Sequence, residues 1–162
     1  KKSPIKIKFV VSNNETAKGL KYPKKFNIDF KVYSFLNKSK SEDKILKDLK
    51  NKKIELICLA GFMKILSKKF IKKFKNKIIN IHPSLLPKYK GLNTHERVIK
   101  NKEKFSGCTV HMVNEKLDSG KIIIQKKVKI LKNDTSEKLA KRILKQEHIL
   151  YPKAINKIFF RC

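Results

Sequence analysis

Two patterns of apolar and polar residues alternate along this chain. Short runs that are apolar throughout, or apolar at every second position, are typical of β-strands. We expect strands at residues 5–11, 30–35, 54–60, 78–82, 108–113 and 122–130. The run at 54–60 is almost continuously apolar, which is typical of a buried strand in a parallel sheet.

Between these runs, apolar residues recur at the three-to-four-residue spacing of an α-helix. Helices are expected at residues 41–52, after a capping Ser67, at 94–100 and at 135–151, where Pro152 would interrupt the last one. The helix at 135–151 would turn Leu139, Ile143 and Leu144 inward. The other apolar helix positions are Ile45, Leu46, Leu49, Phe70, Ile71 and Phe74.

The alternation of strands and helices predicts an α/β fold built on a mainly parallel central sheet. The chain has 162 residues, and neither an internal repeat nor a low-complexity linker divides it, so we expect one domain over residues 1–162. In open α/β sheets, ligands bind beyond the carboxyl ends of the strands. The ends of the strands at 54–60 and 78–82 are therefore the expected place for a site.

Candidate chemistry stands at the second of these strand ends. Asn80 and His82 are two residues apart, and Pro83 ends the strand. Residues i and i+2 of a strand point to the same face, so the amide and the imidazole could converge on one reacting group. The alternative interpretations are a cap or turn residue for Asn80 and a strand-end histidine without catalytic role for His82.

Asp118 offers a carboxylate further along the chain, in the segment Leu117-Asp118-Ser119-Gly120. Such a sequence is also typical of a plain turn. Together, Asn80, His82 and Asp118 could stabilise an oxyanion and move protons without a metal. A carboxylate near His82 would favour its protonated ring, which is the better hydrogen-bond donor to an oxyanion.

The remaining histidines and the cysteines are interpreted as structural. His95 and His111 are expected to have structural roles, and His148 to lie on a helix surface. Three widely spaced cysteines without a CxxC pair argue against a disulfide framework or a zinc site. Cys58, inside an apolar run, is expected to be a buried and inert thiol.

The chain is strongly basic, with a formal net charge of +29. Almost all of this charge comes from lysines spread along the chain, whereas reading bases and clamping phosphates favour arginine. We therefore interpret the lysines as compositional and expect no nucleic-acid partner, although a functional polyanion-binding surface is the alternative. No apolar run has the length of a membrane span and no signal peptide is visible, so a cytoplasmic protein is expected.

Several spaced motifs identify a family. Residues 80–87 resemble the signature of the folate-dependent formyltransferases, and residues 59–63 and 117–120 match the same family in the same order. Residues 88–95, 107–111 and 146–152 are similar to the branch that acts on phosphoribosylglycinamide. The resemblance covers nearly the whole chain.

This resemblance implies a function and a fold. The implied reaction transfers a formyl group from the cosubstrate 10-formyltetrahydrofolate to the amine of 5'-phosphoribosylglycinamide, in de novo purine biosynthesis. The implied fold is the Rossmann-like, three-layer formyltransferase fold. The partners would be small molecules, with no metal, nucleic acid or membrane, and the protein would be a monomer or a homodimer.

The resemblance also assigns roles to residues. Asn80, His82 and Asp118 would be the catalytic residues, and Glu147 would contact the glycinamide substrate. The residues expected to bind the folate are Met63, Lys64, Ile65, Leu66, Asn80, Asn114 and Lys38. For Met63, a place in the core is the alternative.

The sequence departs from the family pattern in three places. Lys64 stands where an arginine is frequent, and Lys90 where a proline is common. Family members also begin with a strand and a glycine-rich loop that holds the substrate phosphate at a helix N-terminus. No such segment precedes the strand expected at residues 5–11, so the sequence is expected to be N-terminally truncated.

Three other functions stay open from the sequence. A methionyl-tRNA formyltransferase would suit the basic charge. A hydrolase that releases formate from formyl-folate would share much of the motif set. A non-catalytic, ligand-binding remnant of the family would agree with the missing N-terminal loop.

Overall fold

A computed structural model describes residues 5–160 of the chain. The chain divides into two compact units. The first comprises Lys1–Glu55 and Leu66–Lys75, and the second comprises Leu56–Ile65 and Asn76–Cys162.

The first unit contains one parallel strand pair and several helices. Strand β1 (Phe9–Ser12) pairs with β2 (Asp29–Val32), so that Phe9 lies opposite Asp29. Both strands are shorter than predicted, and residues 5–8 are not in a strand. Two short helices connect β1 and β2, and two longer ones follow; their bounds are Lys18–Leu20 for the 3-10 helix η1, Lys21–Lys25 for α1, Lys38–Asn51 for α2 and Lys68–Lys73 for α3.

Side-chain caps define the starts of α2 and α3. The Asn37 side chain accepts a hydrogen bond from the backbone N–H of Lys40, and therefore α2 begins three residues before the predicted start. Ser67 caps α3, as predicted. Glu42 is buried on α2, and its carboxylate accepts hydrogen bonds from the N–H of Ser67, at 2.8 Å, and from its hydroxyl. Of the predicted inward face of α2, Ile45 and Leu49 are buried and Leu46 is half-buried.

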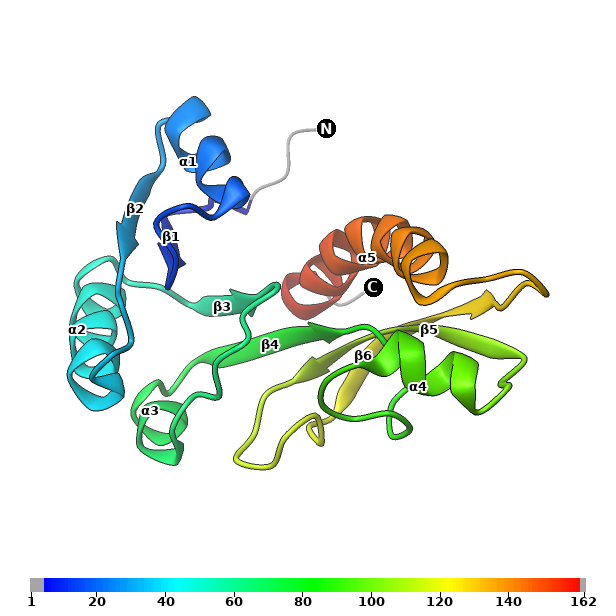
Figure 1. Ribbon diagram of the computed structural model, residues 1–162. Coiled ribbons are helices and arrows are strands. Elements are labelled where there is room, and N and C mark those ends of the chain that lie inside the picture. Colours follow the sequence, from blue (N-terminus) through cyan, green and yellow to red (C-terminus); the bar gives the residue numbers. More distant parts are fainter. Residues whose placement is uncertain (1–4, 161–162) are drawn as a thin grey trace. The chain divides into compact units, whose positions relative to one another are not determined.

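The second unit is built on a four-stranded sheet with the order β3-β4-β5-β6 (Figure 1). The strands are β3 (Leu56–Leu59), β4 (Lys77–His82), β5 (Phe105–Met112) and β6 (Ile122–Lys129). β3 and β4 run parallel, whereas the pairs β4–β5 and β5–β6 are antiparallel. All four strands were predicted, but the pattern of apolar residues does not encode the direction of β5 and β6.

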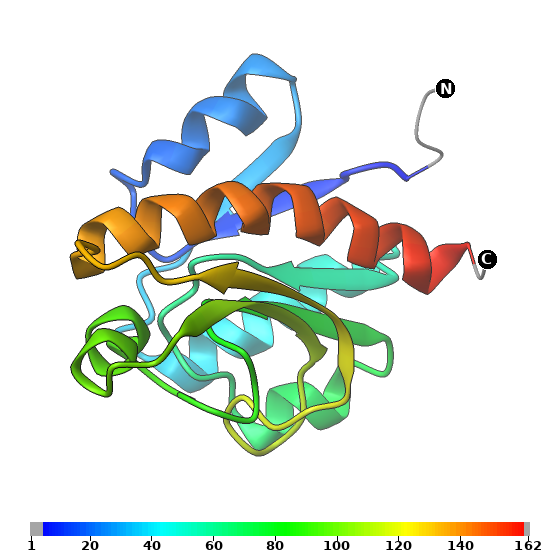
Figure 2. The same ribbon diagram turned by 90° about the vertical axis from the view of Figure 1, so that its right-hand side faces the viewer.

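Helix α5 (Ser136–Phe159) lies along one face of this sheet and completes the core (Figure 2). Its buried residues Leu139, Ile143, Leu150 and Ala154 belong to the same apolar cluster as Ile79, Cys108 and Val110 of the sheet. The shorter helix α4 (Thr94–Lys100) contributes the buried Val98 to this cluster.

Two predictions about α5 are wrong. Leu144 is 48% exposed, because the buried stripe continues through Leu150 and Ala154. Pro152 does not interrupt the helix, which runs on to Phe159. A proline removes the hydrogen bond to the carbonyl four residues earlier, here that of His148. Both residues are exposed, so water can satisfy that carbonyl.

Cys58 on β3 also differs from its prediction. Its side chain is exposed rather than buried. Desolvation by the surrounding atoms nevertheless raises the pKa of its thiol to about 11, so the thiol is neutral at physiological pH, in agreement with the expected inertness. Within residues 5–160, no helix combines the length and the apolar character that crossing a membrane requires.

Candidate active site

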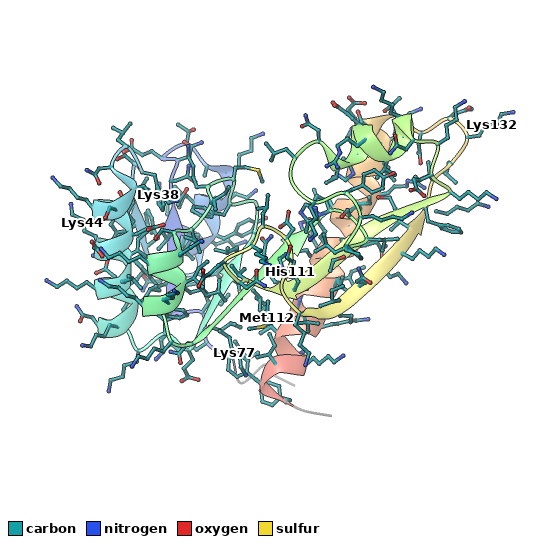
Figure 3. All side chains as sticks on the ribbon, turned by 90° about the horizontal axis from the view of Figure 1, so that it is seen from below. Lys38, Lys44, Lys77, His111, Met112 and Lys132 are labelled. Carbon is teal, nitrogen blue, oxygen red and sulfur yellow. The ribbon has the colours of Figure 1, made fainter. Side chains whose placement is uncertain are left out.

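The antiparallel pair β4–β5 brings four polar side chains of the second unit together. Asn80 lies directly opposite His111, and His82 lies opposite Thr109. Asn80 and His82 are two residues apart on one strand, so they share a face, as predicted. Figure 3 labels His111 next to Met112, at the end of β5. Asp118 joins the group from the loop after β5.

His82 is 5% exposed, and oxygen atoms face both of its ring nitrogens. Its Nε2 lies 2.8 Å from the carbonyl oxygen of Tyr89, and its Nδ1 lies 3.4 Å from Oδ2 of Asp118. A carbonyl oxygen only accepts hydrogen bonds, so Nε2 must carry a proton and donate it. The carboxylate then orients the opposite edge of the ring.

His111 is the fourth member of the group, and the sequence prediction interpreted it only as structural. Its Nδ1 donates to the carbonyl of Met112 at 2.8 Å. Burial, as the largest cause, lowers the pKa of His111, although the Met112 carbonyl and Asp118 act in the opposite direction. In the neutral ring, Nε2 is an acceptor, and it lies 3.4 Å from the amide nitrogen of Asn80. His111 therefore orients the Asn80 amide.

Asp118 lies between the two histidines and is not a simple solvent-facing turn residue. It is 9% exposed, and its Oδ1 lies 3.6 Å from Nε2 of His111. Its Oδ2 accepts a hydrogen bond from the backbone N–H of Gly91 at 2.9 Å. The φ angle of Asp118 is +45°, a left-handed conformation in which aspartate is one of the few tolerated residues.

Gly120 explains why the Asp-Ser-Gly sequence is needed in this loop. A Cβ atom at Gly120 would lie 1.7 Å from the carbonyl oxygen of Met112, so no other residue fits without moving the backbone. The close approach returns the chain to β6 and keeps Asp118 beside His82 and His111.

The loop between β4 and α4 is tied to the strands around the site. The hydroxyl of Thr109 donates to the carbonyl of Ser84 at 2.6 Å and accepts the N–H of Leu86 at 3.1 Å. The Lys90 ammonium donates to the hydroxyl of Ser119 at 2.6 Å. Lys90, one of the departures from the family pattern, thus joins this loop to the loop of Asp118.

The predicted folate-binding residues differ in their exposure to solvent and in their hydrogen bonds. Met63 and Ile65 are 71% and 64% exposed in the segment after β3, which excludes the core alternative for Met63, and Lys64 is exposed between them. Asn114 is exposed, and its side chain accepts the N–H of Lys116 at the start of the Asp118 loop.

Three predicted residues are not joined to the polar group. Leu66 and Lys38 belong to the first unit, where Leu66 is half-buried and Lys38 is exposed at the start of α2. Glu147 is half-buried on α5, and burial raises the pKa of its carboxyl. Among residues 5–160, no hydrogen bond or ion pair connects Glu147 with Asn80, His82 or Asp118.

Sequence reasoning missed two contributors to this site. His111 has the same strand spacing as many structural histidines, and only its register opposite Asn80 distinguishes it. Tyr89 contributes a backbone carbonyl, which no side-chain motif can reveal. Its φ angle of +56° is unusual for an aromatic residue and reflects the tight turn that places the carbonyl near His82.

The arrangement is suited to stabilising negative charge on oxygen. The amide of Asn80 has a second N–H, and the ring of His82 carries a proton between two oxygens. The described residues contain no group of three or more histidine, cysteine or acidic side chains that could hold a metal. Burial, as the larger effect, and His82 both lower the pKa of His95.

Comparison with known proteins gives one consistent picture. The model of the family described as formyl transferase matches residues 1–155. A phosphoribosylglycinamide formyltransferase from Haemophilus influenzae is 44% identical over 155 residues, which cover 94% of this chain and 73% of that protein. The trifunctional purine biosynthetic protein adenosine-3 from Chironomus tentans is also 44% identical, but this chain spans only 11% of its length.

Solved structures agree. A crystal structure of phosphoribosylglycinamide formyltransferase from Anaplasma phagocytophilum has a TM-score of 0.89 at 44% identity and covers 96% of this chain, which spans 76% of that one. The corresponding structure from Bacillus halodurans has a TM-score of 0.91 at 32% identity, with 97% and 82% covered. This likeness confirms the predicted Rossmann-like, three-layer α/β formyltransferase fold. Within residues 5–160, the parallel pairs are β1–β2 and β3–β4, whereas β5 pairs antiparallel with both β4 and β6.

Proposed function

We propose that this chain, which belongs to the formyl transferase family, transfers a formyl group from 10-formyltetrahydrofolate to the amine of 5'-phosphoribosylglycinamide. The observation that carries the proposal is the contact of Asp118 with both His82 and His111, beside the Asn80 amide. The identity of the substrates is inferred from the formyl transferase family and from the names of the relatives. Both are small molecules, and the cytoplasmic location stays a prediction.

The proposed reaction is an acyl transfer. The lone pair of the substrate amine forms a bond to the formyl carbon, and the carbonyl π electrons move onto oxygen. The resulting oxyanion collapses, the bond from carbon to the folate nitrogen breaks, and that nitrogen takes a proton. The amine loses a proton in the same sequence, so that no net charge is created.

Asn80 and His82 would stabilise the oxyanion, and Asp118 would orient His82. The free N–H of Asn80 is one donor. The Nε2–H of His82 is the second, but it now donates to the Tyr89 carbonyl. Access of substrate to this proton requires the Tyr89 carbonyl to give up its hydrogen bond. One such donor typically contributes about 3 kcal/mol to lowering the barrier.

The folate would lie on the exposed segment Met63–Ile65, with Asn114 and Leu66 as further proposed contacts. Lys64 keeps the positive charge of a frequent arginine but lacks its planar fork, so it could hold the anionic part of the folate only as a point charge. Lys38 and Glu147 remain proposed ligand contacts, with Glu147 assigned to the glycinamide.

The proposal is tested with the purified chain, 10-formyltetrahydrofolate and phosphoribosylglycinamide, by following the release of tetrahydrofolate. The chain should catalyse the transfer, and His82→Ala should lower kcat by at least a hundredfold. The matched control is His148→Ala on the exposed face of α5, which should keep the activity. An inactive parent chain, or an active His82→Ala variant, would contradict the proposal. Methionyl-tRNA as the only accepted acceptor would favour the rival function.

A further inference from the structure

A pocket lies beside the loop between β4 and α4, the loop that contacts His82. It has a volume of about 590 Å³ within the second unit, between the end of α4, the start of β5 and the loop after β4. None of Asn80, His82, His111 and Asp118 lines it. Its apolar wall includes Leu85, Val98 and Phe105, of which Phe105 is 39% exposed. The pocket is therefore separate from the candidate active site and offers an aromatic surface.

The charge of this pocket is strongly positive. Lys88, Lys102, Lys104 and Lys127 line it, against a single carboxylate, that of Glu103. Lys88 lies 3.1 Å from Glu103 and satisfies that carboxylate. In the described part of the chain, Lys102, Lys104 and Lys127 have no ion-pair partner. Three cations without a neutralising carboxylate therefore surround the cavity.

The wall of the pocket also holds a neutral hydrogen-bond donor. The Asn101 amide donates one hydrogen to the hydroxyl of Tyr89 and has a second available. An amide hydrogen beside several ammonium groups is suited to a ligand that carries oxygen acceptors.

Lys127 and Phe105 together suggest the kind of ligand. The Lys127 ammonium lies 3.7 Å from the centre of the Phe105 ring. A flat organic group could take this place on the ring, and the displaced ammonium could then meet an anionic group of the same molecule. An aromatic surface beside several lysines and neutral donors suits an organic phosphate better than an apolar molecule or a bare ion.

Tyr89 connects this pocket with the candidate active site. Its hydroxyl donates to Glu103 at 2.9 Å in the pocket wall, and its backbone carbonyl accepts from His82 at 2.8 Å. An anion that attracts Lys88 would weaken its ion pair with Glu103, and thereby the environment of the Tyr89 ring would change. Tyr89 is therefore bonded both to a residue of the pocket wall and to His82.

From these contacts we infer that the pocket binds a phosphorylated organic molecule with a flat group, such as a mononucleotide, and that its occupancy is transmitted to His82 through Tyr89. The site is distinct from the substrates of the proposed function. Lys102 and Lys104 bind the phosphate, Phe105 carries the flat group, and Asn101 supplies a neutral donor.

The first test measures binding of AMP and of tripolyphosphate to the full chain by calorimetry at 0.15 M salt, where diffuse attraction is screened beyond about 8 Å. AMP should bind with one-to-one stoichiometry. The double variant Lys102→Gln/Lys104→Gln should bind it at least tenfold more weakly. The control Lys132→Gln/Lys153→Gln loses the same charge at exposed positions and should stay within twofold of the parent. Equal weakening in both double variants, or no saturable binding, would overturn the inference.

A further variant tests the role of the aromatic ring. Phe105→Leu should weaken the binding of AMP at least fivefold and leave the binding of tripolyphosphate unchanged. An unchanged affinity for AMP would refute the role of the ring.

Transmission to His82 is measured by NMR on the ¹⁵N-labelled chain. AMP should shift the amides of residues 101–106 and the ring nitrogens of His82. In Tyr89→Phe, which lacks the hydroxyl that bonds Glu103, the shifts at 101–106 should remain and the His82 shift should shrink. Unshifted His82 signals in the parent would refute the transmission, and shifts confined to residues 80–82 would place AMP in the active site instead.

Discussion

His111 faces Asn80 across the antiparallel β4–β5 pair, with 3.4 Å between its Nε2 and the amide nitrogen of Asn80. The contact gives His111 a positioning role, because the ring leaves the amide only one orientation in which its N–H donates to Nε2. We predict that His111→Phe lowers kcat of formyl transfer by about tenfold or more, which corresponds to roughly 1.4 kcal/mol of barrier. The KM for the folate should change less. His111→Gln, which can still accept from Asn80, should recover part of the rate, and failure of this rescue would indicate a merely structural role.

A substitution at Asp118 can test its role in catalysis separately from its role in stability. Asn tolerates the left-handed conformation at this position, and its side-chain oxygen can still accept from the N–H of Gly91. Asp118→Asn removes only the charge that faces the two histidines. We expect a hundredfold or larger loss of kcat, since the loss of charge-assisted orientation costs about 3 kcal/mol, with the midpoint of thermal unfolding nearly unchanged. If the free energy of unfolding also fell by about 3 kcal/mol, Asp118 would be needed for the stability of the fold rather than for the reaction.

Lys90 and Ser119 form a contact that the family pattern does not predict, since a proline is common at this position. The ammonium donates to the hydroxyl at 2.6 Å and joins the loop between β4 and α4 to the loop that carries Asp118. A double-mutant cycle with Lys90→Met and Ser119→Ala should give a coupling of about 1 kcal/mol in the free energy of unfolding. The measurement is chemical denaturation of the four proteins. Additive effects of the two changes would show that the contact contributes nothing.

Core packing on α5 distinguishes two leucines that the helical pattern treats alike. Leu139 is fully buried against the sheet, whereas Leu144 is 48% exposed. Leu139→Ala should lower the free energy of unfolding by about 2–5 kcal/mol, and Leu144→Ala by less than about 0.5 kcal/mol. Denaturation in urea measures both. Similar losses would contradict the position of the buried stripe.

The apolar pattern predicted the existence of the strands and longer helices because burial along one face depends on local spacing. It could not set their ends where side-chain caps decide, as at Asn37, or where a partner strand is short, as at β1. It also placed Leu144 on the inward stripe of α5, because spacing alone does not show which of the neighbouring residues Ile143 and Leu144 faces the sheet.

Only those residues of the candidate site that are close in sequence, or that belong to a family motif, could be predicted. Asn80 and His82 share a strand, and the family motif supplied Asp118. His111 required the register of β5 against β4, which joins residues 31 positions apart. The contribution of Tyr89 required the course of a loop, since only its backbone carbonyl contacts His82.

The pH dependence of stability gives a last prediction. Burial lowers the pKa of His111 below its ordinary value of 6.5, so the folded chain binds fewer protons there than the unfolded chain. The free energy of unfolding therefore has its full value above about pH 6.5 and falls as the pH falls through this value toward the lowered pKa of the folded state. His95, whose pKa is lowered chiefly by burial, acts in the same direction. Glu147 acts in the opposite direction, because its raised pKa makes the folded chain bind more protons above pH 4.5.

The difference between parent and variant isolates the contribution of His111. His111→Gln cannot titrate, so its stability should depend less steeply on pH between 7.5 and 5 than that of the parent. Urea denaturation at several pH values measures the two slopes. Parallel curves for His111→Gln and the parent would mean that His111 has the same pKa in the folded and unfolded chain, and that its burial does not exclude the proton.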